Sequence, residues 1–568
     1  MSSLYQKLLF CLLAACGLFL LVECIPFAVV CVNNKDCTEV NATRCVVGQC
    51  QSCKSHPDCE HLSSTPKCSV GTCVTCGNAK QCQDFYNSLG KEEPTPEVSV
   101  ETSVPDARGE TPPKVPDTPP EKVADGPLQL PGRYATIFTS PHPITVTDIE
   151  VDPQNNAYII GHFKEELKTK ERVATGLKDD FYLFIAKLNA DGKVMWLYRY
   201  MFRSLGAALT ILSDGNIVAI GTSRQKSKAD RHCLFLKLTQ DKGDPRGEYV
   251  LPSSVFCEGT DVITDATGRG FYVLLNILGG LKLIKADGKS AEPRSGAKSD
   301  FLIGHMNTSD KLGTFTWFEH SENAGQIEGK KLRLGKNKGL FVSGYFKNGF
   351  SYPKQQKVAF PKQDNKNVFI LRLESDNSHK PDWAFQFGSV RDEQVHDFEL
   401  TSGEAPLIVG YFDGAINVDK CTNIPEPLNK HFMFVLLGNV RGKCVGFQYP
   451  STREKEATSE LSSISVDPEG NVYTAGKYTH NISFGGQTFA STGNRAQSKL
   501  LLMMWNKGGA FIWSESLGDG GNIHDVRLRA NGASLFIVGS YSKTINLEGS
   551  AYNHKEAMFV WRRTPKPR

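Results

Sequence analysis

Beyond about residue 132, hydrophobic positions come in short runs of β-branched and aromatic residues without helical periodicity. A glycine ends one such run at Gly161, Gly221, Gly344, Gly410, Gly476 and Gly539. The spacings are 60, 123, 66, 66 and 63 residues, and F-Y-V-L-L-N at 271–276 fills the long gap without its glycine. The chain therefore carries an internal repeat.

Other strand patterns recur in step with this glycine. A run that often opens with Asp precedes it, and an apolar strand and an aromatic strand follow, as in D-F-Y-L-F-I-A-K-L and M-W-L-Y-R-Y. Four strands per unit and seven units predict an all-β fold, a seven-bladed β-propeller with four-stranded blades over 132–568.

The last unit is short of one strand. N-I-H-D-V-R-L, L-F-I-V-G-S-Y and A-M-F-V-W-R-R supply three strands before the chain ends. The segment 132–140, G-R-Y-A-T-I-F-T-S, is a strand without an inner partner. We therefore predict that it completes the last blade and closes the ring, which leaves no unpaired gap in the sheet order.

The segment 466–478, V-D-P-E-G-N-V-Y-T-A-G-K-Y, combines acidic, glycine and asparagine positions as a calcium loop does. It lacks the distal bidentate Glu of such a loop, so it is predicted to be a hairpin turn. Over 466–518 the pattern resembles SBBP-type β-propeller repeats, D-x-x-G-N-x-Y-x-x-G followed by a strand, a glycine turn and Trp. The resemblance implies the fold and an exported or surface-associated protein, and it supplies no catalytic residues.

The first residues predict export. Lys7 precedes a long apolar run that ends at Glu23, the pattern of a signal peptide over 1–24 and of a secreted or cell-surface protein. Apolar residues continue after Cys24, so an uncleaved membrane anchor is the alternative, and L-A-A-C at 13–16 also resembles a lipobox. The Pro-rich segment 91–131 is predicted to be an extended linker.

Cysteines are concentrated behind the leader, in two similar copies of one pattern over 25–90. Dense cysteines in an exported, core-poor segment predict a disulfide module, with zinc ribbons as the less favoured reading. The ten are Cys31, Cys37, Cys45, Cys50, Cys53, Cys59, Cys68, Cys73, Cys76 and Cys82. Later in the chain, Cys233 is predicted to pair with Cys257, and Cys421 with Cys444, each within one blade.

The charge balance excludes one class of partner. A formal net charge of +4, spread along the chain, is no signature of nucleic-acid binding. Basic clusters at 224–231 and 329–338 suit either polyanions such as sulfated glycans or solvated turns. Three sequons, at Asn41, Asn307 and Asn481, are candidate glycosylation sites.

Candidate chemistry gathers where the inner strands begin. Asp148, Asp261, Asp397 and Asp525 take the same place in their units, where they would either form a carboxylate ring for Ca²⁺ or hydrogen-bond neighbouring blades. No other cofactor is expected. His396 and His524 precede two of these aspartates, and a His-Asp pair suits general acid-base chemistry.

Within a unit the second connection is the long one, so one face of the propeller is expected to carry long loops. Loops on a rigid scaffold are the usual place for recognition. We therefore expect an interaction protein that binds an extracellular protein or glycan on this face. The alternative is a propeller hydrolase or lyase acting on polysaccharide, which would need one deep pocket with carboxylates and a His.

Overall fold

The chain divides into two compact units, Met1–Val123 and Ala124–Arg568. In this computed structural model, the first unit is described only at four short strands. The second unit is described over 133–564 except at 225–230, 294–298, 324–325, 353–357, 361–364, 375–378, 390, 419–420, 425–430, 453, 491–496, 519–520 and 533. The leader, the linker, Asn41 and the side chains of the ten clustered cysteines, and with them the predicted disulfide module, lie outside the described residues.

The four strands of the first unit form two hairpins at matching places in the two cysteine repeats. β1 (Arg44–Val46) pairs with β2 (Gln49–Gln51), and Cys45 lies opposite Cys50. β3 (Lys67–Ser69) pairs with β4 (Thr72–Val74), and Cys68 lies opposite Cys73. The backbone thus repeats where the sequence does.

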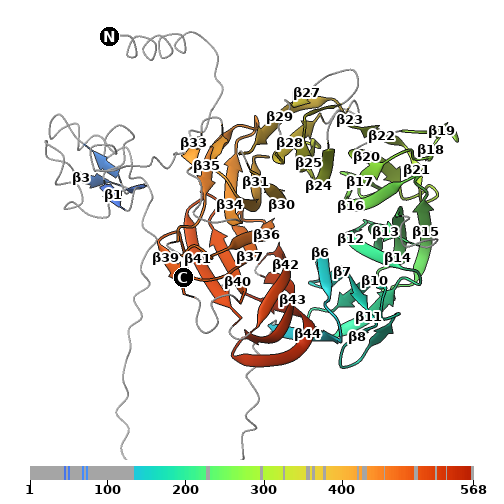
Figure 1. Ribbon diagram of the computed structural model, residues 1–568, viewed down its shortest axis with the longest axis horizontal. Helices are drawn as coiled ribbons and strands as arrows, with labels where there is room; N and C mark the ends of the chain where they lie inside the picture. Colours follow the sequence, from blue (N-terminus) through green and yellow to red (C-terminus); the bar gives the residue numbers. More distant parts are fainter. Residues whose placement is uncertain are drawn as a thin grey trace, which may run out of the picture. The chain divides into compact units, whose positions relative to one another are not determined.

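The second unit is built from antiparallel sheets that follow one another around a ring (Figure 1). We number the large sheets in chain order and give their strands from the centre outwards. Sheet 1 contains β6 (Thr145–Val151), β7 (Ala157–Lys164), β10 (Phe181–Leu188) and β11 (Val194–Arg199). Sheet 2 contains β12 (Ser204–Ile211), β13 (Asn216–Ser223), β14 (His232–Thr239) and β15 (Pro245–Leu251). Sheet 3 contains β16 (Phe256–Thr264), β17 (Gly270–Leu278), β20 (Asp300–Asn307) and β22 (Trp317–His320).

The next three sheets repeat this order. Sheet 4 contains β24 (Gln326–Leu334), β25 (Leu340–Lys347), β28 (Asn367–Leu373) and β29 (Pro381–Phe387). Sheet 5 contains β30 (Gln394–Leu400), β31 (Pro406–Phe412), β34 (Phe432–Gly438) and β35 (Cys444–Gln448). Sheet 6 contains β36 (Ser459–Val466), β37 (Val472–Tyr478), β40 (Lys499–Trp505) and β41 (Phe511–Leu517).

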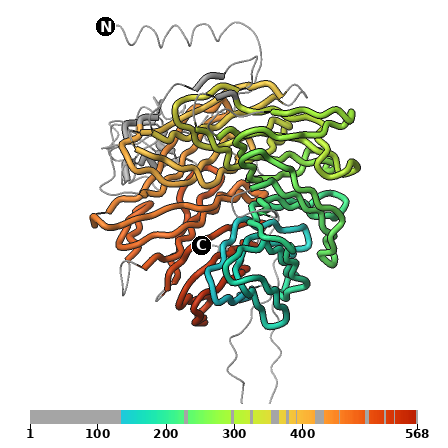
Figure 2. The backbone as a smooth tube through the Cα atoms, turned by 45° about the vertical axis from the view of Figure 1, so that its right-hand side comes forward, coloured from blue at the N-terminus to red at the C-terminus, as the bar shows by residue number. Residues whose placement is uncertain are grey.

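Sheet 7 joins the two ends of the unit. Its order is β42 (Asn522–Asn531), β43 (Ser534–Leu547), β44 (Ser550–Arg563), β5 (Tyr134–Ser140), β8 (Glu166–Lys168) and β9 (Val173–Thr175). β5 pairs with β44 from Tyr134↔Arg562 to Ser140↔Glu556, so the predicted closure is confirmed. Figure 2 shows the same meeting of the first strands, in cyan, with the last, in red.

Small sheets lie within the connections between the strands of the large sheets. They comprise β18 (Leu283–Lys285), β19 (Ser290–Ala291) and β21 (Thr314–Phe315); β23 (Glu322–Asn323), β26 (Phe350–Tyr352) and β27 (Val358–Phe360); β32 (Ile416–Val418) and β33 (Cys421–Ile424); and β38 (Ile482–Phe484) and β39 (Gln487–Phe489). Every described element is a strand, as the all-β prediction requires, and the arrangement is propeller-like. Among the described residues there is no helix long and apolar enough to cross a bilayer.

The repeat glycine is needed because a strand and a ring approach it closely. A Cβ on Gly161 would lie 2.1 Å from the Thr145 carbonyl oxygen and 2.9 Å from the Phe184 ring. The inner strand carries a bulge beside this point, between Val146 and Asp148. The marker that counted the repeats in the sequence is therefore a steric requirement of the sheet.

The turn at 467–471 is a hairpin, as predicted. The Asp467 carboxylate accepts hydrogen bonds from the Asn471 backbone N–H (2.7 Å), the Asn471 side-chain amide (2.8 Å) and the Tyr473 hydroxyl (3.1 Å). Gly470 supplies the positive φ of 88°. Asp152 makes the same three bonds in sheet 1. The D-x-x-x-N-x-Y spacing thus ties each turn to its own strand.

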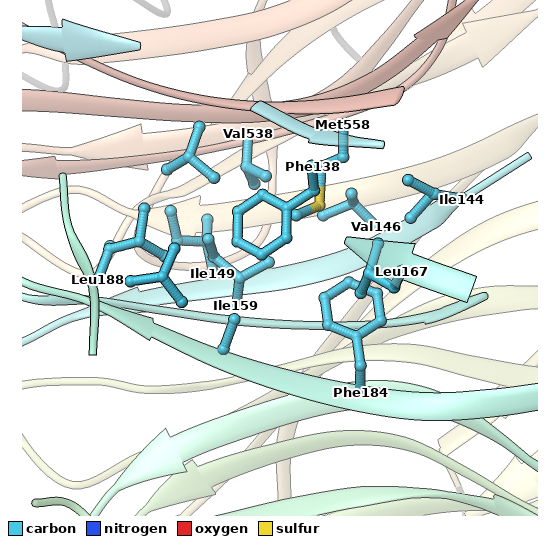
Figure 3. Packing of buried hydrophobic residues seen from close by; sticks show 14 of the residues in the cluster. Phe138, Ile144, Val146, Ile149, Ile159, Leu167, Phe184, Leu188, Val538 and Met558 are labelled. Carbon is cyan, nitrogen blue, oxygen red and sulfur yellow. The ribbon is translucent and has the colours of Figure 1, made fainter. Parts of the chain in front are cut away.

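Neighbouring sheets are held together by continuous apolar packing. Phe138 of β5 is fully buried between Val538 and Met558 of sheet 7 and Ile149 and Ile159 of sheet 1 (Figure 3). Its strand comes from the start of the unit, whereas both sheet 7 residues come from its end. The packing therefore closes the ring as the strand pairing does.

One disulfide is placed differently from the prediction. Cys233 and Cys257 are bonded, as expected, with their Cα atoms 5.0 Å apart. Cys233 lies on β14 of sheet 2 and Cys257 on β16 of sheet 3, so the bond links two sheets. The prediction of a bond within one blade was wrong because β16 opens the next sheet. Cys444 is also disulfide-bonded, and the side chain of Cys421 lies outside the described residues.

Long connections lie on one edge of the ring, with an exception. In sheets 1 and 3 to 6 the second connection is long, as predicted, whereas in sheet 2 it spans only 224–231. In sheet 7 the strands β43 and β44 extend to 14 residues each and meet at a tight turn at 548–549. We call the edge that carries these connections the long-connection edge.

Candidate functional site

The inner-strand aspartates do not all share one position. Asp148, Asp261 and Asp397 follow the bulge of their strands, opposite the residue just before the repeat-glycine position. In sheet 7 the bulge comes earlier, so Val526 pairs with Gly539 and Arg527 takes the aspartate position. The prediction that Asp525 belongs to this set was wrong, because an irregularity in pairing displaces it.

These three aspartates connect neighbouring sheets, the structural role that the sequence allowed. Each accepts a hydrogen bond from a backbone N–H of the next inner strand. The pairs are Asp148 with Leu209 (3.1 Å), Asp261 with Leu332 (2.7 Å) and Asp397 with Ile464 (3.2 Å). Asp525 instead accepts a hydrogen bond from Ser540 of its own sheet (3.3 Å). Within the described residues, no group of three or more His, Cys, Asp or Glu side chains gathers as a metal site.

Basic side chains meet the aspartates at the centre of the ring. Arg333 lies 2.8 Å from Asp397, 3.2 Å from Glu399 and 3.7 Å from Asp261. Lys331 lies 3.4 Å from Asp261. Burial raises the pKa of Asp261, and the charges of Lys331 and Arg333 oppose that rise. The carboxylates here are matched by cations of the protein itself.

The same cluster crosses the seam between sheets 7 and 1. Arg529 lies 3.2 Å from Glu150, and Arg527 donates to the Thr147 carbonyl oxygen (2.9 Å). Burial raises the pKa of Glu150 to about 7, against the opposing charge of Arg529. The cavity between these side chains measures only 30 Å³. The centre is therefore filled by its own ion pairs rather than shaped for a ligand.

This finding corrects the interpretation of the basic cluster at 329–338. Most of it is the inner strand β24, and Lys331 and Arg333 are buried in ion pairs. The rest, 335–338, is a turn in which Lys336 and Lys338 are exposed, so the solvated-turn interpretation holds for that part only. The other basic cluster, 224–231, is described only at its two ends, Arg224 and Arg231.

The two histidines are not equivalent and do not pair with the aspartates that follow them. His396 occupies the bulge of β30, and its Nδ1 donates to the Leu461 carbonyl oxygen (3.0 Å). Burial lowers the pKa of His396, which keeps it neutral. His524 lies 3.7 Å from Glu556 in the same sheet. The arrangement does not supply the His-Asp general base that the sequence allowed as an alternative to a simple preference for these residues where a strand begins.

A different set of carboxylates stands nearer the long-connection edge. Each member immediately precedes the residue opposite the repeat-glycine position. The set comprises Glu258, Glu328, Glu460 and Asp525. Sequence reasoning missed the three glutamates because only Glu258 stands three residues before an Asp, Asp261, whereas Lys331 and Ser463 take that place after Glu328 and Glu460. The signal that could have found them is their shared place, just before the residue opposite the repeat-glycine position.

Two of these glutamates line the principal cavity, which measures about 630 Å³. We call it the edge cavity, since its walls are the ends of β16, β17, β24 and β25 that meet the long connections. Its lining residues are Arg231, Phe256, Glu258, Asn276, Leu278, Ser299, Gln326, Glu328, Lys347 and Asn348. Cys257 stands between two of them, so the Cys233–Cys257 disulfide anchors this wall to sheet 2.

Glu258 and Glu328 differ in the direction of their pKa shifts despite sharing the cavity. Burial raises the pKa of Glu258, and the nearby charges of Lys330 and Arg231 only partly offset it. Burial also acts on Glu328, but Lys330, 3.2 Å away, and the hydrogen-bonded hydroxyl of Tyr345 outweigh it and lower its pKa. Both contacts fall on Oε2 of Glu328, so Oε1 is the oxygen less engaged by the protein. The pKa values of the two carboxyl groups are thus shifted in opposite directions.

The described sequons carry polar contacts. The Asn307 amide donates to Asp310 (3.2 Å), and the Asn481 amide donates to Glu454 (2.6 Å). Attachment of a glycan at either amide would replace these bonds.

No protein-family model matches the chain, and no curated protein matches it. Among solved structures, the polysaccharide lyase Uly1 is 8% identical with a TM-score of 0.39, over 75% of this chain and 90% of that one. The endosialidase of phage phi92 is 8% identical with a TM-score of 0.36, over 77% and 70%. The periplasmic gluconolactonase PpgL of Pseudomonas aeruginosa is 9% identical with a TM-score of 0.36, over 76% and 100%. We assign no activity to this chain from these likenesses.

Proposed function

We propose that this protein is a secreted or cell-surface binding protein whose large sheets are the seven blades of an SBBP-type propeller and whose edge cavity receives a glycan. The observation that carries the proposal is the cavity of about 630 Å³ at the long-connection edge. Its volume lies within the range of roughly 300 to 1,000 Å³ that small-ligand sites occupy. A site for a flat protein surface would not need such a hollow.

The lining suits a sugar better than an apolar ligand. Gln326, Asn348 and the glutamates present hydrogen-bonding groups, whereas Phe256 and Leu278 are the apolar members. Sugar hydroxyls pair with such side chains, and an aromatic ring offers a face to the apolar side of a pyranose. The inter-sheet disulfide beside Phe256 holds this wall in place, which lowers the entropy lost on binding.

The test is a glycan-array screen of the full chain, followed by calorimetry with the saccharides retained. Gln326→Ala removes one lining side chain, and Lys507→Ala, in the exposed short turn between β40 and β41 on the opposite edge, is the matched control. We expect the first variant to weaken binding and the second to leave it unchanged. Equal affinity of Gln326→Ala and the parent, or retention of extracellular proteins but no glycan, contradicts the proposal.

A second candidate is a glycoside hydrolase, favoured by the opposite pKa shifts of Glu258 and Glu328 in one cavity. Protonated Glu258 would donate its proton to the glycosidic oxygen as the bond to the anomeric carbon breaks. Ionised Glu328 would take a proton from the water that attacks that carbon. A lyase is the related possibility. The edge cavity supplies the carboxylates expected of such an enzyme, but no His is among its lining residues.

Release of reducing ends from the bound saccharide distinguishes this candidate from simple binding. The variants Glu258→Gln and Glu328→Gln should each abolish turnover while the saccharide still binds. An unsaturated product, detected by its ultraviolet absorbance, would indicate the lyase instead. Absence of any product over prolonged incubation leaves the binding function and refutes the enzyme.

A further inference from the structure

The lining of the edge cavity contains two basic side chains and two carboxyl groups, the latter being Glu258 and Glu328. Arg231 and Lys347 line it, and neither has a carboxylate within salt-bridge distance among the described residues. Arg224 lies close enough to Arg231 and Glu258 for its pKa to respond to both charges, after the larger effect of burial, which lowers it. Lys330 is engaged by Glu328 (3.2 Å).

With Arg224 and Lys330 beside the cavity, the region holds four cations. Asp180, whose charge also acts on Arg224, is paired with Arg203 (2.7 Å), so the carboxyl groups that remain are the two of the lining. One of the two, Glu258, is buried in a way that disfavours its ionised form. The Nε of Arg224 is buried and has no hydrogen-bond acceptor within the described part of the chain, so this guanidinium group could also accommodate an anion. Guanidinium groups placed near one another repel unless an anion lies between them.

The guanidinium of Arg231 is held in a geometry suited to an anion. It lies over the ring of Phe256, 5.4 Å from the centroid, so one face is covered and its N–H edge remains for a ligand. Its backbone carbonyl accepts hydrogen bonds from Cys257 N–H (2.9 Å) and Ser253 Oγ (2.7 Å). The disulfide at Cys257 fixes the same strand. A planar guanidinium fixed in this way matches the two oxygens of a carboxylate or sulfate.

We propose that the edge cavity recognises an acidic saccharide, whose anionic group is bound by Arg231. The inference rests on the proposed glycan-binding function and names the ligand class of that same site. The anion is either the carboxylate of a sugar acid or a sulfate ester, since both present coplanar oxygens to the N–H edge of Arg231. Lys347 and Arg224 add attraction, and the polar lining is left for the sugar hydroxyls.

The experiment uses the full chain and three probes in isothermal calorimetry. They are a glucuronate-containing tetrasaccharide, its carboxyl-reduced neutral counterpart and a sulfated neutral tetrasaccharide of the same length. We expect at least one acidic probe to bind about tenfold to a hundredfold more tightly than the reduced probe, as one charge-assisted contact implies. Its affinity should fall as salt is raised from low to physiological concentration. The preferred acidic probe identifies the anion.

Two variants test the residue. Arg231→Gln should lose most of the preference for the acidic probe while keeping affinity for the neutral one. Arg246→Gln is the matched control, since Arg246 is exposed on β15 of the sheet adjoining Arg231 and lies at the opposite edge. If Arg231→Gln fails to give folded protein, the preference for the acidic probe is measured instead with Lys347→Gln, a change at the end of a strand.

The results separate the acidic-ligand inference from the proposed glycan binding. Equal affinity for acidic and neutral probes, with both weakened by Gln326→Ala, overturns the acidic-ligand inference and leaves glycan binding intact. No affinity for any probe, with an empty glycan array, overturns both. A preference for acid that survives in Arg231→Gln and in Lys347→Gln places the anion elsewhere and overturns the inference as well.

Discussion

Replacing Phe138 by Ala should weaken the closure of the ring more than any other single change in β5. The side chain is fully buried and contacts residues of both sheet 7 and sheet 1. A buried Phe removes on the order of 150 Å² from water, which at about 25 cal/mol per Å² amounts to roughly 4 kcal/mol. Ala retains part of this area, but the cavity left behind adds a loss of its own. We expect a decrease of about 3 to 5 kcal/mol in the free energy of unfolding.

Urea unfolding followed by tryptophan fluorescence measures this loss, with limited proteolysis between β5 and β6 as a second readout. Thr139→Ala is the matched control, because Thr139 is the next residue of the same strand and is only partly buried, with a long 3.5 Å contact to the Lys168 carbonyl. The control should change stability by less than about 0.5 kcal/mol. A loss for Phe138→Ala that is no larger than that of the control would refute the closure argument.

Two further predictions follow from the inter-sheet contacts, and a third concerns Glu393, a buried residue between β29 and β30 whose carboxyl group accepts a hydrogen bond from the Ser389 backbone N–H (2.9 Å). Replacing Cys233 and Cys257 together by Ser should cost about 2 to 4 kcal/mol, measured by thermal unfolding with and without reductant, and a parent protein insensitive to reductant would contradict it. Arg333→Met leaves the carboxylates of the central cluster without their shared cation and should cost about 3 to 5 kcal/mol at pH 7. The loss should be smaller at pH 4, because burial raises the pKa of Asp261, and equal losses at both pH values would refute the argument. Burial raises the pKa of Glu393 to about 8, so its contribution is full below about pH 4.5 and is lost as pH rises towards 8. Glu393→Gln should therefore lose less stability than the parent between pH 5 and pH 8 in urea titrations.

The central charge cluster also affects how firmly neighbouring sheets are held together. Buried ion pairs contribute little net stability but penalise any arrangement that separates them. Here Arg333 joins inner strands of sheets 3, 4 and 5, and Arg529 joins sheet 7 to sheet 1. The ion pairs thus connect neighbouring sheets to one another at the centre of the ring.

Much of the local architecture follows from the sequence because its signals act within one strand, one turn or one repeat unit. The D-x-x-x-N-x-Y turn reports contacts between residues close in the chain, such as Asp467 with Tyr473, and the repeat glycine reports contacts with neighbouring strands of its own sheet. The missing strand of the last unit could be inferred by counting. These patterns were sufficient for the strand order and for the pairing of β5 with β44.

The tertiary structure decided what depends on the meeting of separate sheets. The shift of the β42 bulge put Arg527 rather than Asp525 in the aspartate position, and the start of β16 made the Cys233–Cys257 bond an inter-sheet link. The edge cavity joins Arg231 from one connection with Glu328 of another sheet. The sequence by itself determined the strands and their order, because the pattern of residues that predicts a strand or a turn lies within one short segment of the chain. The site arises from the packing angle and register between sheets, which no single repeat encodes.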